Sequence, residues 1–124
     1  MNNKKKLVVL VDDNSVNLHF GKRLLGRKFT VITMPSAVTL FPLLEKKIPD
    51  LILMEIEIPV INGFEALEIL KSKPETRDIP VIFVTSRAGE EDRSKGLALG
   101  AADYIVKPYT PSLLFEKINT TLGR

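Results

Sequence analysis

The sequence predicts an α/β protein in which five parallel β-strands, each followed by a helix, form an open doubly wound sheet. Five short apolar runs are spaced along the 124 residues, and four of them are rich in Val and Ile without polar alternation. Strands buried on both faces have this pattern, which is typical of a parallel sheet covered by helices. Longer segments with helical spacing separate the runs, and right-handed crossovers turn that alternation into one sheet.

The strands and the first helix come directly from this pattern. The first helix is predicted to begin after Asn14, whose side chain can cap it, and to carry Val16, Phe20 and Leu24 as an apolar stripe at i, i+4 and i+8. The predicted strands cover residues 7–11, 29–33, 51–54, 81–85 and 104–106.

The four later helices have start and stop signals of their own. Ser36 can cap the second helix, Pro74 lies just beyond the third, Gly100 closes the fourth, and Pro111 suits the first turn of the last. Their predicted apolar residues are Val38, Leu40, Phe41 and Leu44, then Phe64, Leu67 and Leu70, then Leu97 and Leu99, and finally Leu114, Phe115, Ile118 and Leu122.

Composition restricts the class of protein. Apolar residues make up 44% and charged residues 27%, which is globular composition, and the length predicts one domain over residues 1–124. The absence of cysteine excludes disulfide frameworks, zinc–thiolate sites and thiol catalysis. Because the apolar runs are short and Asp12 and Asp13 end the first one, we expect no membrane span, no signal peptide and a cytoplasmic location.

Charge is unevenly distributed. Residues 1–28 carry seven basic and two acidic groups, although the whole chain has only 18 Lys and Arg against 15 Asp and Glu. A basic segment can favour an acidic partner. The basic residues are not interleaved with aromatic residues, so the pattern favours a solvated surface over a nucleic-acid interface.

Polar side chains follow four of the predicted strands. Asp12 and Asp13 follow the first strand, Glu55 the third and Lys107 the fifth, while Thr85 ends the fourth. The carboxyl ends of parallel strands meet at one edge of a sheet, so these side chains should line one pocket. Clustered carboxylates need a compensating cation, their oxygens suit Mg²⁺, and the hydroxyl and ammonium groups suit a phosphoryl group.

With these residues in place, the sequence resembles the receiver domain of two-component response regulators over essentially the whole chain. The matching segments are LVVLVDDN (7–14), DLILMEIEIPVINGFEAL (50–67), IPVIFVTS (79–86) and GAADYIVKPYTPSLL (100–114). The resemblance implies a flavodoxin-like strand order, 2-1-3-4-5. It also implies Mg²⁺-dependent transfer of a phosphoryl group to a strand-three aspartate from a histidine kinase or a phosphotransfer protein.

The resemblance assigns a role to each residue of the pocket. Asp12 and Asp13 would hold the Mg²⁺, with the backbone carbonyl of Glu57 as a further ligand. Thr85 would donate a hydrogen bond to one phosphoryl oxygen. Lys107 would neutralise another and pair with the strand-three carboxylate.

The resemblance also implies a switch and two local backbone features. Tyr104 matches the aromatic residue that turns inward when Thr85 shifts. The bond from Lys107 to Pro108 is expected to be a cis peptide, which only X-Pro bonds adopt at low cost. Asn62 and Gly63 would close the loop after the third strand.

The acceptor position is the departure from the family, because Glu55 stands where the family has aspartate. The additional methylene moves the carboxylate roughly 1–1.5 Å further from the strand, and in-line phosphoryl transfer depends on closer positioning than that. We therefore expect phosphotransfer to be absent or very poor and Mg²⁺ binding to be weakened. Receivers of the family catalyse their own phosphotransfer. Because that reaction is expected to be impaired here, this chain is not expected to act as an enzyme.

The sequence leaves open what Glu55 does instead. It could imitate the phosphorylated state in part, reaching toward Lys107 and Thr85, or it could disable the switch and leave a constitutive docking module. A further alternative is an ordinary receiver in which aspartate was changed to glutamate. A flavodoxin-like nucleotide site is disfavoured, because Asp12 and Asp13 stand where a phosphate-binding loop would be.

The expected partners are a histidine kinase or phosphotransfer protein and an output protein. Output contacts would use the face near Tyr104, formed by the fourth helix, the fifth strand and the fifth helix. No membrane partner is expected, and nucleic acid only through an output domain outside this sequence, which is either a stand-alone regulator or a piece of a longer one. Near the pocket, Glu57 and Arg87 are expected to form an ion pair, and His19 to face solvent.

Overall fold

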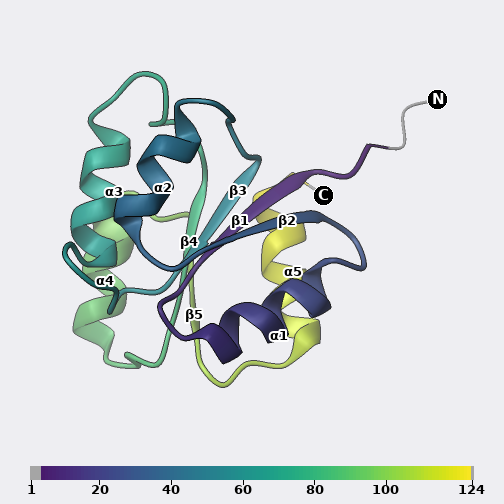
Figure 1. Ribbon diagram of the computed structural model, residues 1–124. Helices are drawn as coiled ribbons and strands as arrows, with labels where there is room; N and C mark the ends of the chain where they lie inside the picture. The colour runs from purple at the N-terminus through teal and green to yellow at the C-terminus, as the bar shows by residue number, and fades with distance from the viewer. Residues whose placement is uncertain (1–3, 124) are drawn as a thin grey trace.

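The computed structural model describes residues 4–123 and confirms the predicted architecture. Five parallel strands form one sheet in the order β2-β1-β3-β4-β5, and a helix follows each strand (Figure 1). The strands are β1 (Leu7–Val11), β2 (Thr30–Met34), β3 (Leu51–Met54), β4 (Val81–Thr85) and β5 (Asp103–Val106). The helices are α1 (Ser15–Leu25), α2 (Ala37–Leu44), α3 (Gly63–Lys71), α4 (Glu90–Ala98) and α5 (Pro111–Thr121).

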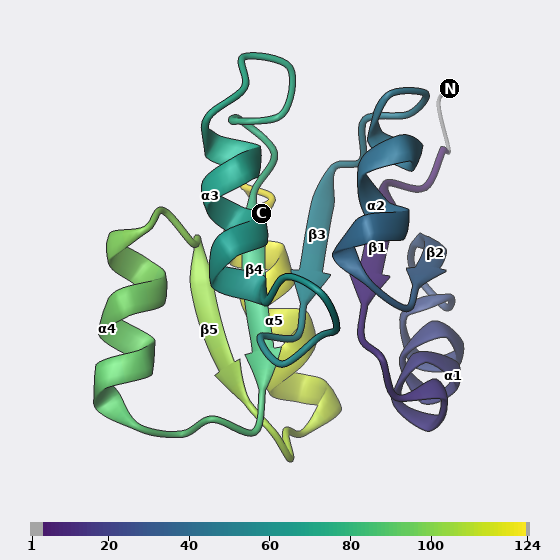
Figure 2. The ribbon, with the colours of Figure 1, turned by 60° about the vertical axis from the view of Figure 1, so that its left-hand side comes forward.

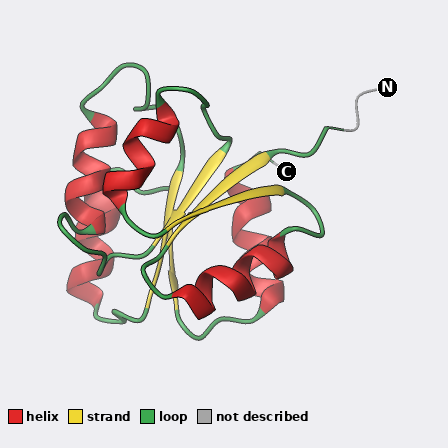
Figure 3. Ribbon diagram, viewed as in Figure 1, coloured by secondary structure: helices red, strands yellow, loops and turns green. Residues whose placement is uncertain are grey.

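The sheet lies between two layers of helices (Figure 3). The side chains of β3 and β4 are buried along their whole length, as expected for strands covered on both faces. One core cluster joins the sheet to α2 and α3, and the other joins it to α1 and α5. None of the helices within residues 4–123 is long and apolar enough to cross a membrane.

The predicted apolar stripe of α1 is wrong in its first two members. Val16 is 72% exposed and Phe20 is 56% exposed, whereas the helix buries Gly21 and Leu25. A Cβ atom on Gly21 would lie 2.5 Å from the Leu10 side chain, so glycine allows the close approach of α1 to the sheet. The side that faces the core is therefore marked by a small residue.

Smaller corrections concern other predicted core positions. Val38 of α2 is 49% exposed and Leu97 of α4 is 39% exposed, although both were placed on apolar faces. Strand β2 runs one residue later than predicted and β5 begins one residue earlier, at Asp103. The remaining members of the predicted apolar sets are buried or half-buried.

The predicted helix starts are confirmed. The side chains of Asn14 and Ser36 accept hydrogen bonds from the backbone two or three residues into α1 and α2, and Pro111 is the first residue of α5. Asn62 and Glu65 form a capping box at the start of α3. These caps fix where each chain segment leaves the carboxyl edge of the sheet.

Gly63 brings the start of α3 close to the end of β3. Its N–H donates to the carbonyl of Ile56 at 2.7 Å, and a Cβ atom there would lie 2.7 Å from the carbonyl oxygen of Glu55. No side chain fits in that space, so the glycine holds the loop after β3 against the strand end. The loop also contains Val60, which is 85% exposed and has a φ of 75°.

Candidate functional site

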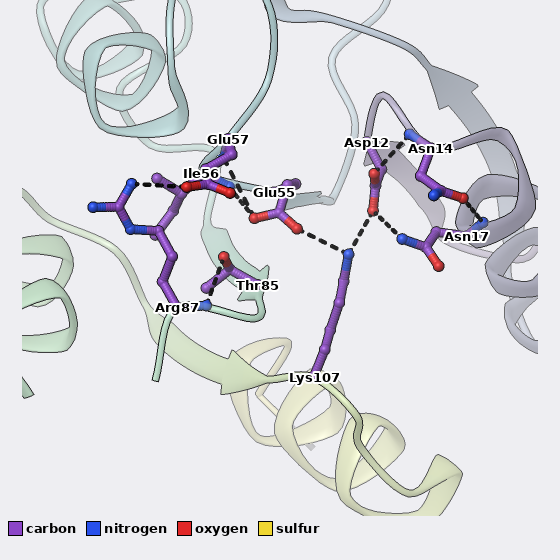
Figure 4. Close-up of polar contacts among 9 residues, drawn as sticks. All are labelled: Asp12, Asn14, Asn17, Glu55, Ile56, Glu57, Thr85, Arg87 and Lys107. Atoms are coloured by element: carbon purple, nitrogen blue, oxygen red, sulfur yellow. Dashed lines mark hydrogen bonds and ion pairs between the residues drawn. The ribbon is translucent and has the colours of Figure 1, made fainter. Parts of the chain in front are cut away.

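The residues predicted at the strand ends converge at the carboxyl edge of the sheet, where the arrowheads of Figure 2 point. Lys107 is the centre of the arrangement. Its Nζ donates to Asp12 Oδ2 at 2.7 Å and to Glu55 Oε1 at 2.9 Å (Figure 4). The side chains of Lys107, Asp12 and Glu55 are only 20%, 5% and 10% exposed, so one ammonium group pairs with two nearly buried carboxylates and balances one of their two negative charges.

Asp12 has further donors within the chain. Its Oδ1 accepts the backbone N–H of Asn14 at 2.9 Å, and its Oδ2 accepts the Asn17 side-chain amide at 3.2 Å. Both oxygens are therefore occupied by groups of this chain. Sequence reasoning missed Asn17, whose position in the first turn of α1, five residues after Asp12, was the available signal.

Glu55 is held at both of its oxygens as well. While Oε1 binds Lys107, Oε2 accepts the backbone N–H of Ile56 at 2.8 Å and that of Glu57 at 3.4 Å. The longer side chain folds back onto the amides of its own loop. No buried side-chain polar atom within the described residues lacks a hydrogen-bond partner, so the network is internally complete.

The charge of Lys107 is stabilised in spite of its burial. Burial alone would lower the pKa of Lys107, but its hydrogen bonds to Asp12 and Glu55 and their negative charges outweigh that effect and raise the pKa above its usual value. The ammonium group therefore stays protonated throughout the physiological range. It acts as a permanent positive charge at the strand ends.

Thr85 and Tyr104 form a separate cluster beside this network. Thr85 is fully buried and its Oγ1 accepts the backbone N–H of Arg87 at 3.2 Å. Within residues 4–123 no hydrogen bond joins Thr85 to Glu55, so of the two contacts named for imitation of the phosphorylated state only the one to Lys107 is present. The Glu55 carboxylate is instead directed to Lys107 and to the loop amides.

Tyr104 is turned inward, with 3% of its surface exposed. Its hydroxyl donates to the backbone carbonyl of Arg87 at 2.6 Å, and its ring packs edge-on against Phe83 with 6.3 Å between centroids. Burial raises the pKa of Tyr104 above its usual value.

The predicted ion pair between Glu57 and Arg87 is confirmed. Arg87 Nη1 lies 3.4 Å from Glu57 Oε2. Arg87 has a second partner that the sequence did not indicate, because its Nε lies 2.9 Å from Asp92 Oδ2 in the first turn of α4. The predicted cis peptide between Lys107 and Pro108 is confirmed, and His19 is exposed as expected.

A cleft of about 540 Å³ opens above the Lys107 network. Asp12, Glu55, Lys107 and Ser86 contribute polar groups to it, and the exposed ring of Phe20 forms part of its apolar wall. A cleft of this size with a few convergent polar groups is the usual form of a ligand site.

The two aspartates predicted as metal ligands differ in their exposure to solvent. Asp12 is buried and bound to Lys107, while Asp13 is exposed. Within residues 4–123 no three acidic or histidine side chains are grouped as a metal site. The oxygens of Asp12 and Asp13 are of the type that Mg²⁺ prefers, and those of Asp12 already accept three hydrogen bonds from groups of this chain.

Comparison with known proteins gives a consistent result. The family model described as response regulator receiver domain matches residues 8–119. A probable cyclic di-GMP phosphodiesterase from Vibrio cholerae is 33% identical over 115 residues, which are 93% of this chain and 26% of that protein. The phosphate regulon transcriptional regulatory protein PhoB from Rhizobium meliloti is 31% identical over 119 residues, which are 96% of this chain and 52% of that protein.

A solved structure shows the same fold over nearly the whole length. The receiver domain of sensor histidine kinase PA1611 from Pseudomonas aeruginosa PAO1, with a magnesium ion coordinated in its active site cleft, superposes with a TM-score of 0.88 at 26% identity. The match covers 97% of this chain and 99% of that chain. By contrast, this chain spans about a quarter to a half of the two curated relatives.

Proposed function

We propose that this chain, which belongs to the response regulator receiver domain family, is a receiver that signals through protein contacts without being phosphorylated at the usual position. In this proposal Glu55 occupies the acceptor position, and its link to Lys107 takes the place of the phosphoryl group. The observation that carries the proposal is the double engagement of Glu55, by Lys107 at one oxygen and by loop amides at the other.

The position of the Glu55 carboxylate supports a loss of phosphotransfer. Attack on a phosphoryl group needs a free carboxylate oxygen in line with the leaving group, at about 3–3.5 Å. Glu55 Oε2 is bound to the Ile56 amide at 2.8 Å, and Oε1 is bound to Lys107 at 2.9 Å. Whichever oxygen attacked would first have to leave its donor.

Mg²⁺ would be held by Asp12, Asp13 and the backbone carbonyl of Glu57, as proposed from the family. When bound, the ion supplies positive charge to phosphoryl oxygens. In this chain Lys107 already pairs with both Asp12 and Glu55 and offsets part of their negative charge, so we propose that Mg²⁺ binding is weakened. The magnesium ion coordinated in the related PA1611 receiver supports the location of the site.

Between imitation and silencing, the inward position of Tyr104 favours imitation. The tyrosine is buried, and its hydroxyl donates to the Arg87 carbonyl, an arrangement that the family associates with the active state. A carboxylate has one charge and two oxygens, whereas a phosphoryl group has more of both, so the imitation is partial.

The proposed partners follow from the family and from the surfaces on either side of the site. A histidine kinase or phosphotransfer protein would approach the cleft, and an output protein or domain would bind the face formed by α4, β5 and α5. Nucleic acid would be reached only through such an output domain. The whole-protein activities of the longer relatives are not assigned to this chain, because the match covers only part of each.

The proposal is tested by intact-mass measurement after incubation with Mg²⁺ and acetyl phosphate, for the chain and for Glu55→Asp in parallel. We expect the mass of one phosphoryl group to be added to the variant alone. Addition to both proteins would contradict the block at Glu55. Addition to neither would also contradict it, because the pocket would then have lost its chemistry for another reason.

A further inference from the structure

Arg87 joins three segments around the mouth of the site. It lies in the loop between β4 and α4, and its guanidinium group binds a carboxylate from each of two other segments. Nε and Nη2 donate to the two oxygens of Asp92 at 2.9 and 3.4 Å, which is a two-point contact with α4. Nη1 makes a single contact of 3.4 Å with Glu57, in the loop after β3.

The backbone of Arg87 holds the two residues that the family uses as its switch. Its N–H donates to Thr85 Oγ1 at 3.2 Å, and its carbonyl accepts the Tyr104 hydroxyl at 2.6 Å. Where the Arg87 backbone lies therefore decides whether the buried tyrosine has an acceptor. A buried hydroxyl without an acceptor is costly, so the position of Tyr104 depends on this loop.

Helix α4 contributes to the same environment. A Cβ atom on Gly96 would lie 3.5 Å from the Tyr104 ring, so α4 packs closely over it, and Arg93 Nη1 lies 3.5 Å from the Tyr104 carbonyl oxygen. Asp92 lies on this helix, one turn before Gly96. An Arg87 side chain fixed to Asp92 is thus fixed to the helix that covers Tyr104.

The two ends of the Arg87 contact differ in strength. Asp92 is 26% exposed and offers both oxygens to the guanidinium fork, a geometry that makes such pairs specific. Glu57 is 67% exposed and makes one long contact, which solvent and salt weaken readily. The first contact is suited to hold the loop, and the second is suited to be exchanged.

We propose that Arg87 is a positioning residue, which keeps its own backbone carbonyl in place for Tyr104 by clamping the β4–α4 loop to Asp92. Glu57 is the exchangeable end of the clamp and connects it to the loop that also binds Glu55. The proposal rests on the proposed function only in treating the inward tyrosine as the signalling state. Anything that draws Glu57 away loosens one end and leaves the tyrosine buried, whereas loss of Asp92 releases it.

A surface ion pair without further consequence is the competing explanation. Acidic residues in the first turn of a helix are favourable there without any arginine partner. The two explanations differ in what happens to Tyr104 when the Arg87 side chain is shortened. Because both switch contacts use the Arg87 backbone, Arg87→Ala leaves donor and acceptor present and removes only the clamp.

The test follows Tyr104 directly by ¹⁹F NMR of protein labelled with 3-fluorotyrosine. The chain has two tyrosines and no tryptophan, so a Tyr109→Phe variant assigns the two resonances. Arg87→Ala, Asp92→Asn and Glu57→Gln are compared with Arg87→Lys, which keeps the charge without the fork. Glu91→Gln is the matched control, because it removes a charge from the same turn at an exposed residue.

We expect Arg87→Ala and Asp92→Asn to move the Tyr104 resonance toward that of a solvent-exposed tyrosine, with Arg87→Lys in between. Glu57→Gln and Glu91→Gln should leave it unchanged. An unchanged resonance in Arg87→Ala would overturn the proposal, as would an equal shift in Glu57→Gln and Asp92→Asn. Urea unfolding of each variant identifies any shift that arises from loss of the fold.

This test is independent of the acceptor chemistry, because no phosphodonor is present. If acetyl phosphate modified the unaltered chain, the proposed block at Glu55 would fail while a Tyr104 response to Arg87→Ala would still support the clamp. If the block held and Tyr104 did not respond, only the clamp would fail.

Discussion

Two networks at the same edge of the sheet place one cation between two carboxylates, yet they differ in burial. Lys107 binds Asp12 and Glu55, whose side chains are 5% and 10% exposed. Arg87 binds Asp92 and Glu57, whose side chains are 26% and 67% exposed. Burial makes the first network costly to break, because each lost partner leaves a charge without water, whereas water can replace any partner in the second.

The comparison also separates two tasks within one site. The buried network fixes Glu55, and we propose that it thereby decides the chemistry. The exposed network joins α4 to two loops, and we propose that it thereby decides the position of Tyr104. Experiments on each network should therefore give different readouts, with large effects on stability from the first and small ones from the second.

The largest effect is expected for Lys107→Met. Removal of the ammonium group strands two carboxylates in a nearly buried position, and loss of one partner from a buried pair costs about 3–5 kcal/mol. Urea unfolding at neutral pH measures the loss. Lys117→Met is the matched control, because Lys117 pairs with the single carboxylate of Asp103 at 3.2 Å and is itself 32% exposed.

A combined variant distinguishes charge from packing. Adding Asp12→Asn and Glu55→Gln to Lys107→Met removes the stranded charges, so most of the lost stability should return. If the combined variant is as unstable as Lys107→Met alone, the Lys107 side chain stabilises the fold by packing and not by its charge. The contrast between a buried and an exposed ion-pair network would then fail.

The next effect is expected for Gly63→Ala, which tests the backbone that carries Glu55. The new Cβ would lie 2.7 Å from the Glu55 carbonyl oxygen and 2.9 Å from Ile56 Cα, so backbone has to move. Overpacking of this kind costs about 1–3 kcal/mol. Gly89→Ser is the control, because nothing lies within 4 Å of that position and serine can cap α4. Equal unfolding midpoints for the unaltered chain and Gly63→Ala would contradict the close approach.

An alkaline loss of stability is expected from the buried groups. The pKa values of Lys107 and Tyr104 are raised in the folded chain, by the carboxylate partners in the first case and by burial in the second. The unfolded chain therefore loses these protons first. Both groups have ordinary pKa values of about 10, and below that pH the stability that they contribute is complete. This stability is lost as the pH rises through their raised pKa values in the folded chain.

Urea midpoints measured from about pH 8 to about pH 11 test this expectation. Lys107→Met should remove part of the alkaline decline. Arg87→Ala should remove only the part that comes from Tyr104, because the released tyrosine loses the burial that raises its pKa, while arginine itself remains protonated over the whole range. A decline that is the same in Lys107→Met as in the unaltered chain would assign it to other groups.

The smallest effect is expected for the stability of Arg87→Ala. Exposed ion pairs contribute about 0–1 kcal/mol, and the two contacts of Arg87 should stay within that range and diminish with added salt. Asp92→Asn should lose about the same small amount of stability as Arg87→Ala, and urea unfolding measures both. A loss as large as that of Lys107→Met would remove the distinction between the two networks.

Much of the fold could be predicted from the sequence, because local signals agreed with the buried apolar runs. Asn14 and Ser36 cap helices where the pattern placed them, and the strand ends brought Asp12, Lys107 and their partners together. These features depend on residue type and spacing, which the sequence displays.

The sequence-based predictions failed where the position of a side chain depends on how closely two backbone segments approach each other. The stripe of Val16 and Phe20 was placed on the core side of α1, but Gly21 marks that side, because a helix approaches the sheet most closely where a side chain is absent. One of the alternatives for Glu55 had its carboxylate reaching toward both Lys107 and Thr85, but it contacts Lys107 and bends back to its own loop amides. Asn17 and Asp92 were missed although each lies only five residues after its partner, because these contacts depend on the turn that begins α1 and α4.

The central claim is that Lys107 and the loop amides satisfy the Glu55 site without a metal ion, and a Mg²⁺ titration tests it most directly. The amide NMR signals of residues 12–14 and 55–57 are followed in the unaltered chain and in Glu55→Asp, whose carboxylate lies one methylene closer to the strand. We expect at least roughly tenfold tighter Mg²⁺ binding by Glu55→Asp, which corresponds to about 1.4 kcal/mol. Equal affinity, or tighter binding by the unaltered chain, would contradict the claim.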